Sequence, residues 1–202
     1  MRYLDSGLPP CIVPRVDMEQ AFPAIDVSPE LLLKAQGIRA VFFQLHGALT
    51  EGCHYPGADG KAAARYHRQD TTGLHLLKKI GCLPIVVVSG EEALLPPGVV
   101  ATGVQTMVAK NGQDHSAAAE ALLQSCGLAW SQAAVMAYDW PDLSLMRRAA
   151  FSAAAADAHL EVKAQAHYVS PFSAGHGAAR SLCDVLLVAS GRYAQLLEEF
   201  RA

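Results

Sequence analysis

Short apolar runs alternate with segments of helical periodicity from Ile38 to the C-terminus, and this alternation constrains the fold more than any other feature. The apolar runs are residues 40–43, 84–88, 104–109, 133–137, 151–155 and 167–169. The segments with helical spacing are residues 72–80, 114–126, 141–148, 158–166 and 178–189. Strands that are apolar on both faces and separated by helices predict a parallel sheet covered on both sides, the doubly wound α/β architecture.

The first 36 residues differ from the rest of the chain because prolines interrupt every possible element. Within them, only Ser28–Ala35 has the pattern of a short helix, with Ser28 as its N-cap. We therefore predict an arm over residues 1–36, lying on an α/β domain formed by residues 37–202.

Composition and charge exclude several classes of protein. The formal net charge of −3, from 16 basic and 19 acidic residues, gives no reason to expect nucleic acid or an anionic membrane as a partner. No run of 18 apolar residues exists, and the N-terminus lacks the apolar stretch of a signal peptide. The five cysteines form no C-x-x-C pair, which argues against a disulfide framework or a thiolate zinc site, and most are expected in the core. These features predict a cytoplasmic protein.

Polar residues follow four of the predicted strands. They lie at 44–47, 89–91, 111–115 and 138–142. Because ligands of open α/β sheets bind outside the carboxyl ends of the strands, these four loops predict a crevice at one edge of the sheet. Convergence of polar loops predicts a pocket and says nothing yet of its ligand.

Four strings carry a resemblance to a known family. They are VFFQLHGALTEG at 41–52, SG at 89–90, AYDWPDLSLMRRAAFSAAAADAHLEVKAQAHYVS at 137–170 and GHGAARSLCDVLLVASG at 175–191. Together they resemble the capless 3-deoxy-D-manno-octulosonate 8-phosphate phosphatases of the haloacid dehalogenase (HAD) superfamily. The resemblance implies a Rossmannoid domain without a large cap domain, with a β-hairpin flap at about 53–66. It also implies a homotetramer in which such flaps meet.

The resemblance further implies a reaction through an aspartyl-phosphate. A carboxylate attacks phosphorus, a second carboxylic acid two residues later protonates the leaving group, and a magnesium ion and a lysine neutralise the phosphate. This sequence departs from that pattern at four positions, where it has Gln44, His46, His115 and Tyr138. An amide is too poor a nucleophile to form the ester. We therefore predict a catalytically impaired homologue, a pseudophosphatase that binds, scaffolds or regulates, in which Mg²⁺ is lost and no cofactor is expected.

Other positions match the family pattern or stand near its charged positions. Ser89 and Gly90 are retained, Arg68 and Asp70 match a segment that reaches the substrate, and His176 replaces an arginine. These five residues are predicted to contact a small anionic ligand or a protein partner.

Asp139 and Asp142 are the remaining candidates for metal ligands. The competing interpretation is that Asp142 stabilises the start of the helix after Pro141. A transition-metal site formed by His46, His115 and His176 with Asp139 is a further alternative.

The functional alternatives are hydrolysis of a sugar phosphate such as 3-deoxy-D-manno-octulosonate 8-phosphate, and new chemistry that uses His46 as an acid or base. For Trp140 we expect core packing, with closure of the pocket over a ligand as the alternative.

Overall fold

A six-stranded parallel sheet forms the centre of the computed structural model, which describes residues 25–53, 55–56, 62–89, 95–109 and 115–201. The spatial order of the strands is β5-β4-β1-β6-β7-β8. Their bounds are Ala40–Gln44 (β1), Leu83–Ser89 (β4), Gln105–Ala109 (β5), Ala133–Ala137 (β6), Phe151–Ala154 (β7) and Tyr168–Val169 (β8). The doubly wound architecture and all six strands are confirmed, because each predicted apolar run coincides with a strand.

Strand β1 lies where the chain reverses its direction of travel across the sheet. Ala40 pairs with Leu83 of β4 on one side and with Ala133 of β6 on the other. Every residue of β1 is buried, because helices cover both faces of the sheet. The carboxyl end of β1 is therefore the topological switch point, where ligands of such folds bind.

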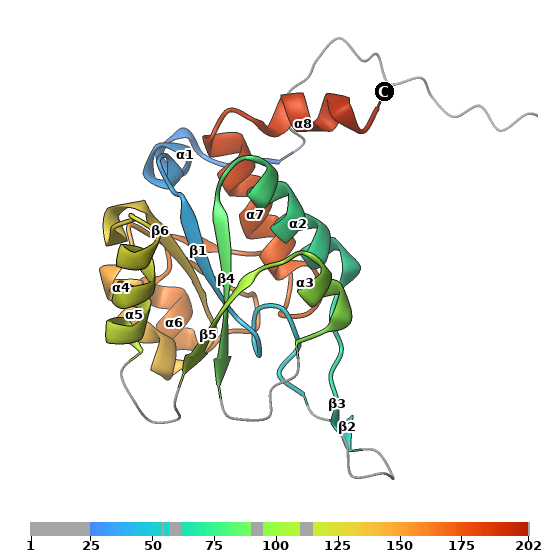
Figure 1. Cartoon of the computed structure of the whole chain (residues 1–202), viewed down its shortest axis with the longest axis vertical. Coiled ribbons are helices and arrows are strands. Elements are labelled where there is room, and N and C mark those ends of the chain that lie inside the picture. The colour runs from blue at the N-terminus through green and yellow to red at the C-terminus, as the bar shows by residue number, and fades with distance from the viewer. Residues whose placement is uncertain (1–24, 54, 57–61, 90–94, 110–114, 202) are drawn as a thin grey trace, which may run out of the picture.

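Two groups of helices cover the sheet, as Figure 1 shows. One contains α2 (Arg68–Lys79), α3 (Pro97–Ala101) and α7 (Ala178–Ala189), and the other contains α4 (Ser116–Ser125), α5 (Leu143–Arg148) and α6 (Leu160–Gln165). The chain ends in α8 (Tyr193–Glu199), and two short 3₁₀ helices lie at Trp130–Gln132 (η1) and Trp140–Asp142 (η2). Fully buried aromatic side chains, among them Phe42, Phe43 and Phe151, fill the core.

Helix α1 (Pro29–Ala35) begins after Ser28, whose hydroxyl accepts a hydrogen bond from the Leu31 N–H at 3.3 Å. This confirms the one helix predicted in the N-terminal arm, and it packs against α7. The rest of the predicted arm, residues 1–24, lies outside the described residues. The predicted boundary at residue 36 remains a prediction.

The flap consists of β2 (Tyr55–Pro56) and β3 (Ala62–Ala63), paired antiparallel with Tyr55 opposite Ala63. It projects from the body of the domain (Figure 1). Apart from this hairpin and the helices, the described residues form no cap over the sheet. The predicted flap is confirmed.

The structure differs from the predicted helices at two places, and it buries two of the four described cysteines. Helix α2 begins four residues before the predicted segment, because the His67 side chain caps it by accepting a hydrogen bond from the Gln69 N–H. Helix α8 was not predicted at all. Of the four cysteines in the described residues, Cys82 and Cys183 are buried, whereas Cys53 and Cys126 are exposed.

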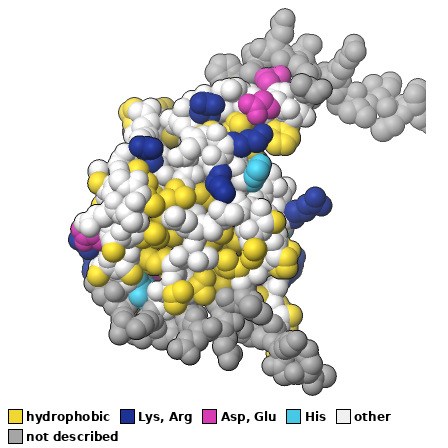
Figure 2. All heavy atoms as spheres, viewed as in Figure 1, with side chains coloured by type: hydrophobic (Ala, Val, Ile, Leu, Met, Phe, Trp, Pro, Cys, Tyr) yellow, Lys and Arg dark blue, Asp and Glu magenta, His cyan; other side chains and the backbone are white. Residues whose placement is uncertain are grey.

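Apolar side chains gather across the middle of the face drawn in Figure 2. Val100 of α3 and Val108 of β5 are among the exposed apolar residues of the chain. Strand β5 is an edge strand that pairs only with β4 among the described residues, so its outer side is not covered by another strand. No helix in the described part of the chain is long and apolar enough to cross a membrane.

Candidate functional site

The loops that follow β1 and β6 meet at the carboxyl edge of the sheet and form the centre of the candidate site (Figure 1). Gln44 ends β1, and Tyr138, Asp139 and Asp142 follow β6. Gly90 and the Ser89 side chain lie outside the described residues, so their predicted ligand contacts remain predictions.

A buried hydrogen bond joins the two loops. The Gln44 side-chain amide donates to Oδ1 of Asp142, and each of the two residues is 5% exposed. Oδ2 of Asp142 accepts from the backbone N–H groups of Tyr138 at 2.8 Å and Asp139 at 3.2 Å. The carboxylate therefore receives three N–H donors. Gln44 therefore supplies one of the three donors that offset the desolvation of the buried Asp142 carboxylate.

Burial raises the pKa of the Asp142 carboxyl, and the two backbone hydrogen bonds and the nearby His115 oppose this rise. Asp142 stands at the N-cap position of α5, but its side chain makes no capping bond to that helix. Its carboxylate accepts the Asp139 N–H at the start of η2, the turn that contains Pro141 and leads into α5. Asp139 completes this capping box, because its side chain accepts a hydrogen bond from the Trp140 N–H at 2.8 Å. The interpretation that Asp142 stabilises the start of the helix at Pro141 is therefore supported, although the bond is made to η2 and not to α5.

Tyr138 occupies the space directly above Gly47. A Cβ atom at residue 47 would lie 2.1 Å from Cγ of Tyr138, and Gly47 has a φ of +92°, so only glycine fits beneath the ring. Burial raises the pKa of the Tyr138 hydroxyl, and the charges of Asp157, Cys53 and Asp139 raise it further. The phenol is thus neutral at physiological pH and fills the crevice with a ring instead of a carboxylate.

Histidines occupy three other positions around this edge. His46 is half-buried, and its Nδ1 lies 3.0 Å from the Thr50 hydroxyl. His115 is buried immediately before α4. His176 lies with its Nε2 3.8 Å from Oε2 of Glu51.

A turn at Gly175 brings His176 against the loop after β1. A Cβ atom at residue 175 would lie 2.6 Å from the backbone nitrogen of Glu51, and Gly175 donates its N–H to the Ala48 carbonyl at 3.2 Å. The sequence did not identify Thr50 or Glu51 as part of the site, because the resemblance assigns roles in the string at 41–52 only to residues 44 and 46.

Asp70 has a structural contact that the sequence did not reveal. Its carboxylate is 2% exposed and accepts the backbone N–H groups of Arg180 at 2.7 Å and Gly177 at 3.3 Å. These are free N–H groups at the start of α7, where Gly177 has no side chain to cap the helix. Burial raises the pKa of Asp70 to about 6, against the lowering effect of the two backbone hydrogen bonds. Asp70 therefore caps α7 and is not open to a ligand, whereas Arg68 is exposed.

Trp140 is 61% exposed, so the expectation that it packs in the core was wrong. Its indole N–H donates to Nδ1 of His159 at 3.0 Å, and the same nitrogen accepts the Glu161 N–H at 3.2 Å. Because Nδ1 accepts both bonds, the neutral His159 ring carries its proton on Nε2. This bond fixes the indole at the edge of the site.

No protein-family model matches the chain. The 3-deoxy-D-manno-octulosonate 8-phosphate phosphatase KdsC of Salmonella typhimurium is 28% identical over 166 residues, which are 82% of this chain and 88% of that protein. A hypothetical protein from Xanthomonas campestris has a similar structure, with a TM-score of 0.81 and 26% identity over 89% of this chain and 97% of its own. The chain is a homologue of HAD superfamily hydrolases.

A third similar structure is the cobalt-bound form of the deoxy-D-mannose-octulosonate 8-phosphate phosphatase from Haemophilus influenzae. It has a TM-score of 0.72 and 26% identity, over 79% of this chain and 93% of its own. Relatives of this HAD homologue therefore include phosphatases and bind divalent metal ions.

The donor groups of the chain fit such an ion poorly. The Asp142 carboxylate already accepts three N–H groups. Tyr138 offers a neutral phenol, and Gln44 offers a neutral amide, so neither supplies a negative charge to the ion. Magnesium needs carboxylate oxygens to offset the cost of removing its water. Among the described residues, no three His, Cys, Asp or Glu side chains gather to hold a metal ion. The histidines and Asp139 that form the alternative transition-metal set are therefore not brought together.

Proposed function

We propose that this chain is a HAD-fold binding protein that takes a small anionic ligand in the crevice and does not form an aspartyl-phosphate. The observation that carries the proposal is the buried hydrogen bond from Gln44 to Asp142. The nucleophile of the family reaction must stand at the end of β1 and point at phosphorus. Here that position holds an amide whose nitrogen is engaged by a carboxylate.

The groups that face the crevice are suited to binding more than to phosphoryl transfer. The imidazole N–H groups of His46, His115 and His176 are hydrogen-bond donors of the kind that bind an anion. No carboxylic acid stands at residue 46 to protonate a leaving group. We also propose that the divalent ion of the relatives is lost here, because Gln44 and Tyr138 are neutral.

The second candidate is a hydrolase of a sugar phosphate such as 3-deoxy-D-manno-octulosonate 8-phosphate. The comparisons support this alternative better than the non-catalytic proposal, because curated relatives over most of the chain are phosphatases that act on this compound. In such an enzyme His46 is the best-placed acid or base, since it follows Gln44 by two residues. A nucleophile other than residue 44 would then be required.

A single set of measurements separates the two candidates. The purified chain is incubated with 3-deoxy-D-manno-octulosonate 8-phosphate and millimolar Mg²⁺ or Co²⁺, and phosphate release and binding heat are recorded. The binding proposal predicts heat without phosphate release, and it predicts that His46→Ala weakens binding. His75→Ala, an exposed histidine on α2, is the matched control.

The hydrolase would be established instead if the chain releases phosphate at the rate of a phosphatase, if His46→Ala abolishes this activity, and if His75→Ala leaves it unchanged. If neither binding heat nor phosphate release is observed, the crevice does not bind this class of ligand. The function would then lie in binding a protein partner.

A further inference from the structure

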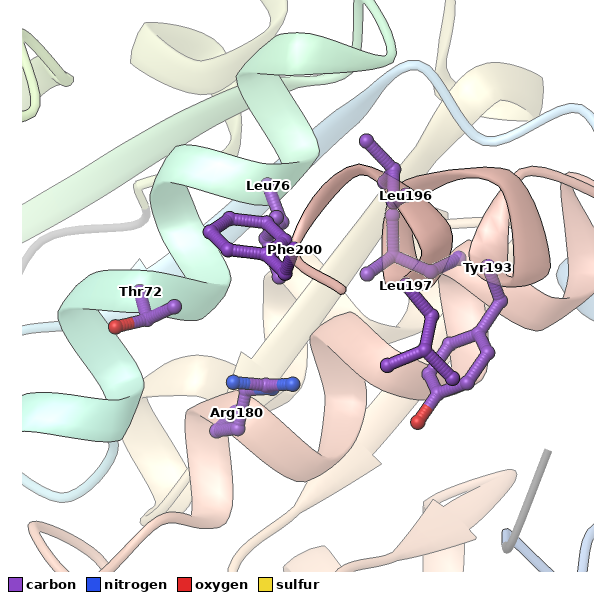
Figure 3. Close-up of a pocket in the computed structure, with 8 residues that line it drawn as sticks. Thr72, Leu76, Arg180, Tyr193, Leu196, Leu197 and Phe200 are labelled. Atoms are coloured by element: carbon purple, nitrogen blue, oxygen red, sulfur yellow. The ribbon is translucent and has the colours of Figure 1, made fainter. Parts of the chain in front are cut away.

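Helices α2, α7 and α8 enclose a pocket of about 250 Å³ that none of the predicted crevice residues lines. Leu76, Leu187 and Leu196 are buried and form its apolar floor, while Leu197 and Phe200 stand at its rim. Figure 3 shows Leu76 on α2 close to Phe200, with Leu196 and Leu197 on α8 beside them. Phe200 is 65% exposed although it borders this apolar space, so part of the pocket wall is in contact with water.

One end of the pocket is polar. Arg180 extends from α7 toward the space framed by Phe200 and Leu197 (Figure 3). Its Nε donates to Oδ1 of Asp184 at 2.8 Å, whereas its two Nη groups make no hydrogen bond or ion pair with the residues that the structure describes. The Arg180 backbone is fixed by Asp70, so the base of the side chain is held in place.

Two hydroxyl groups accompany this guanidinium, from Thr72 and Tyr193. Burial raises the pKa of the Tyr193 hydroxyl, with a further rise from Asp184, so the group is a hydrogen-bond donor at neutral pH. On the rim, Lys79 lies 5.2 Å from the centre of the Phe200 ring and 3.3 Å from Glu199. The Thr72 hydroxyl donates to the Arg68 carbonyl at 3.4 Å. The Nη groups of Arg180 therefore remain as the charged donors of the pocket.

We propose that this pocket binds a free medium-chain carboxylate, with its apolar body between α2 and α8 and its anionic group on the Nη groups of Arg180. A guanidinium can engage one carboxylate through Nε and a second through its outer edge, because its five N–H donors form a planar fork. At about 30 Å³ for each group of the size of water, a volume of about 250 Å³ holds roughly eight groups, which is the carbon chain of an eight-carbon carboxylate whose oxygens lie against Arg180. Octanoate has this size and polarity.

The test is a titration of the full chain with octanoate and with 1-octanol, followed by calorimetry and by amide chemical shifts. We expect octanoate to bind with a Kd on the order of 1 mM, typical of a ligand of this size. Arg180→Gln is expected to weaken octanoate binding by about tenfold or more and to leave 1-octanol binding within about twofold. Arg192→Gln, an exposed arginine at the start of α8, is the matched control and changes neither.

Two further variants keep the proposal testable if Arg180→Gln folds poorly. Asp184→Asn preserves the hydrogen-bond acceptor for Arg180 but removes the competing negative charge, so octanoate binds more tightly. Leu197→Trp fills the space and abolishes binding of both ligands. Octanoate affinity that is unchanged in Arg180→Gln or in Leu197→Trp would overturn the proposal, as would the absence of octanoate binding to the wild-type chain.

Discussion

The buried carboxylate of Asp70 makes the stability of this protein depend on pH in a specific window. The pKa of Asp70 is raised from its ordinary 3.8 to about 6, because burial disfavours the charged form. The folded state therefore binds more protons than the unfolded state between these two values, and the free energy of unfolding falls as pH rises through the window. The difference of about two pKa units corresponds to about 3 kcal/mol, a loss that is complete above pH 6.

Asp70→Asn removes this titration while it keeps an oxygen to accept the Arg180 N–H. Urea unfolding of the wild type and the variant is measured from pH 4 to pH 8, and the difference between their free energies of unfolding is plotted. We expect the wild type to lose about 3 kcal/mol of its free energy of unfolding relative to the variant across the window.

Asp142 and Asp184, whose pKa values burial also raises, titrate in both proteins, so their contributions cancel in the difference. Arg68→Gln, two residues away and exposed, is the control and keeps the wild-type slope. A difference that does not vary with pH would refute the assignment of Asp70 as a buried, charged cap.

Three further predictions concern the crevice and the flap. Gln44→Leu removes the side-chain donor to the buried Asp142 carboxylate, and we expect it to lower the free energy of unfolding by about 2–3 kcal/mol in urea titrations; a loss below about 0.5 kcal/mol would contradict this role. Millimolar Mg²⁺ is expected to leave the melting temperature unchanged, because binding to the native state alone would raise it; a rise of several degrees that Asp139→Asn removes would argue for a retained metal site. The exposed flap around Tyr55 favours a homotetramer, and light scattering that gives the 21.4 kDa of one chain would count against it.

The strands were predictable because burial on both faces leaves an unambiguous pattern. Ala133–Ala137 is apolar throughout and is fully buried, and its predicted bounds agree with β6. Helix α7 was predicted at Ala178–Ala189 because its apolar residues recur at helical spacing. The start of α2 was missed because a histidine is an unusual cap, so no common capping residue marks Arg68 as the first residue. Helix α8 is a short seven-residue element with one buried residue, Leu196, and it packs against α7, which the local sequence does not reveal.

The candidate site was predictable in its composition but not in its contacts. The resemblance placed Gln44 and Tyr138 at the carboxyl ends of β1 and β6, and the structure brings their loops together. It could not show that Gln44 donates to Asp142, which is 98 residues away, or that Asp70 caps a helix 107 residues later. Such contacts depend on tertiary packing. A residue that matches a binding motif in sequence can therefore make structural hydrogen bonds and be unavailable to a ligand.

The substitutions at residues 44 and 138 are physically connected through Asp142. A buried carboxylate at this edge needs positive charge or N–H donors to offset its desolvation. A divalent ion can supply the charge, but only if carboxylates from both loops share it. With an amide at residue 44, the carboxylate receives an N–H donor directly, and this hydrogen bond joins the two loops. The ring of Tyr138 then fills the space over Gly47. Replacing Gln44 alone with aspartate would therefore set two carboxylates against each other, and we predict that Gln44→Asp by itself does not confer phosphatase activity on the proposed binding protein.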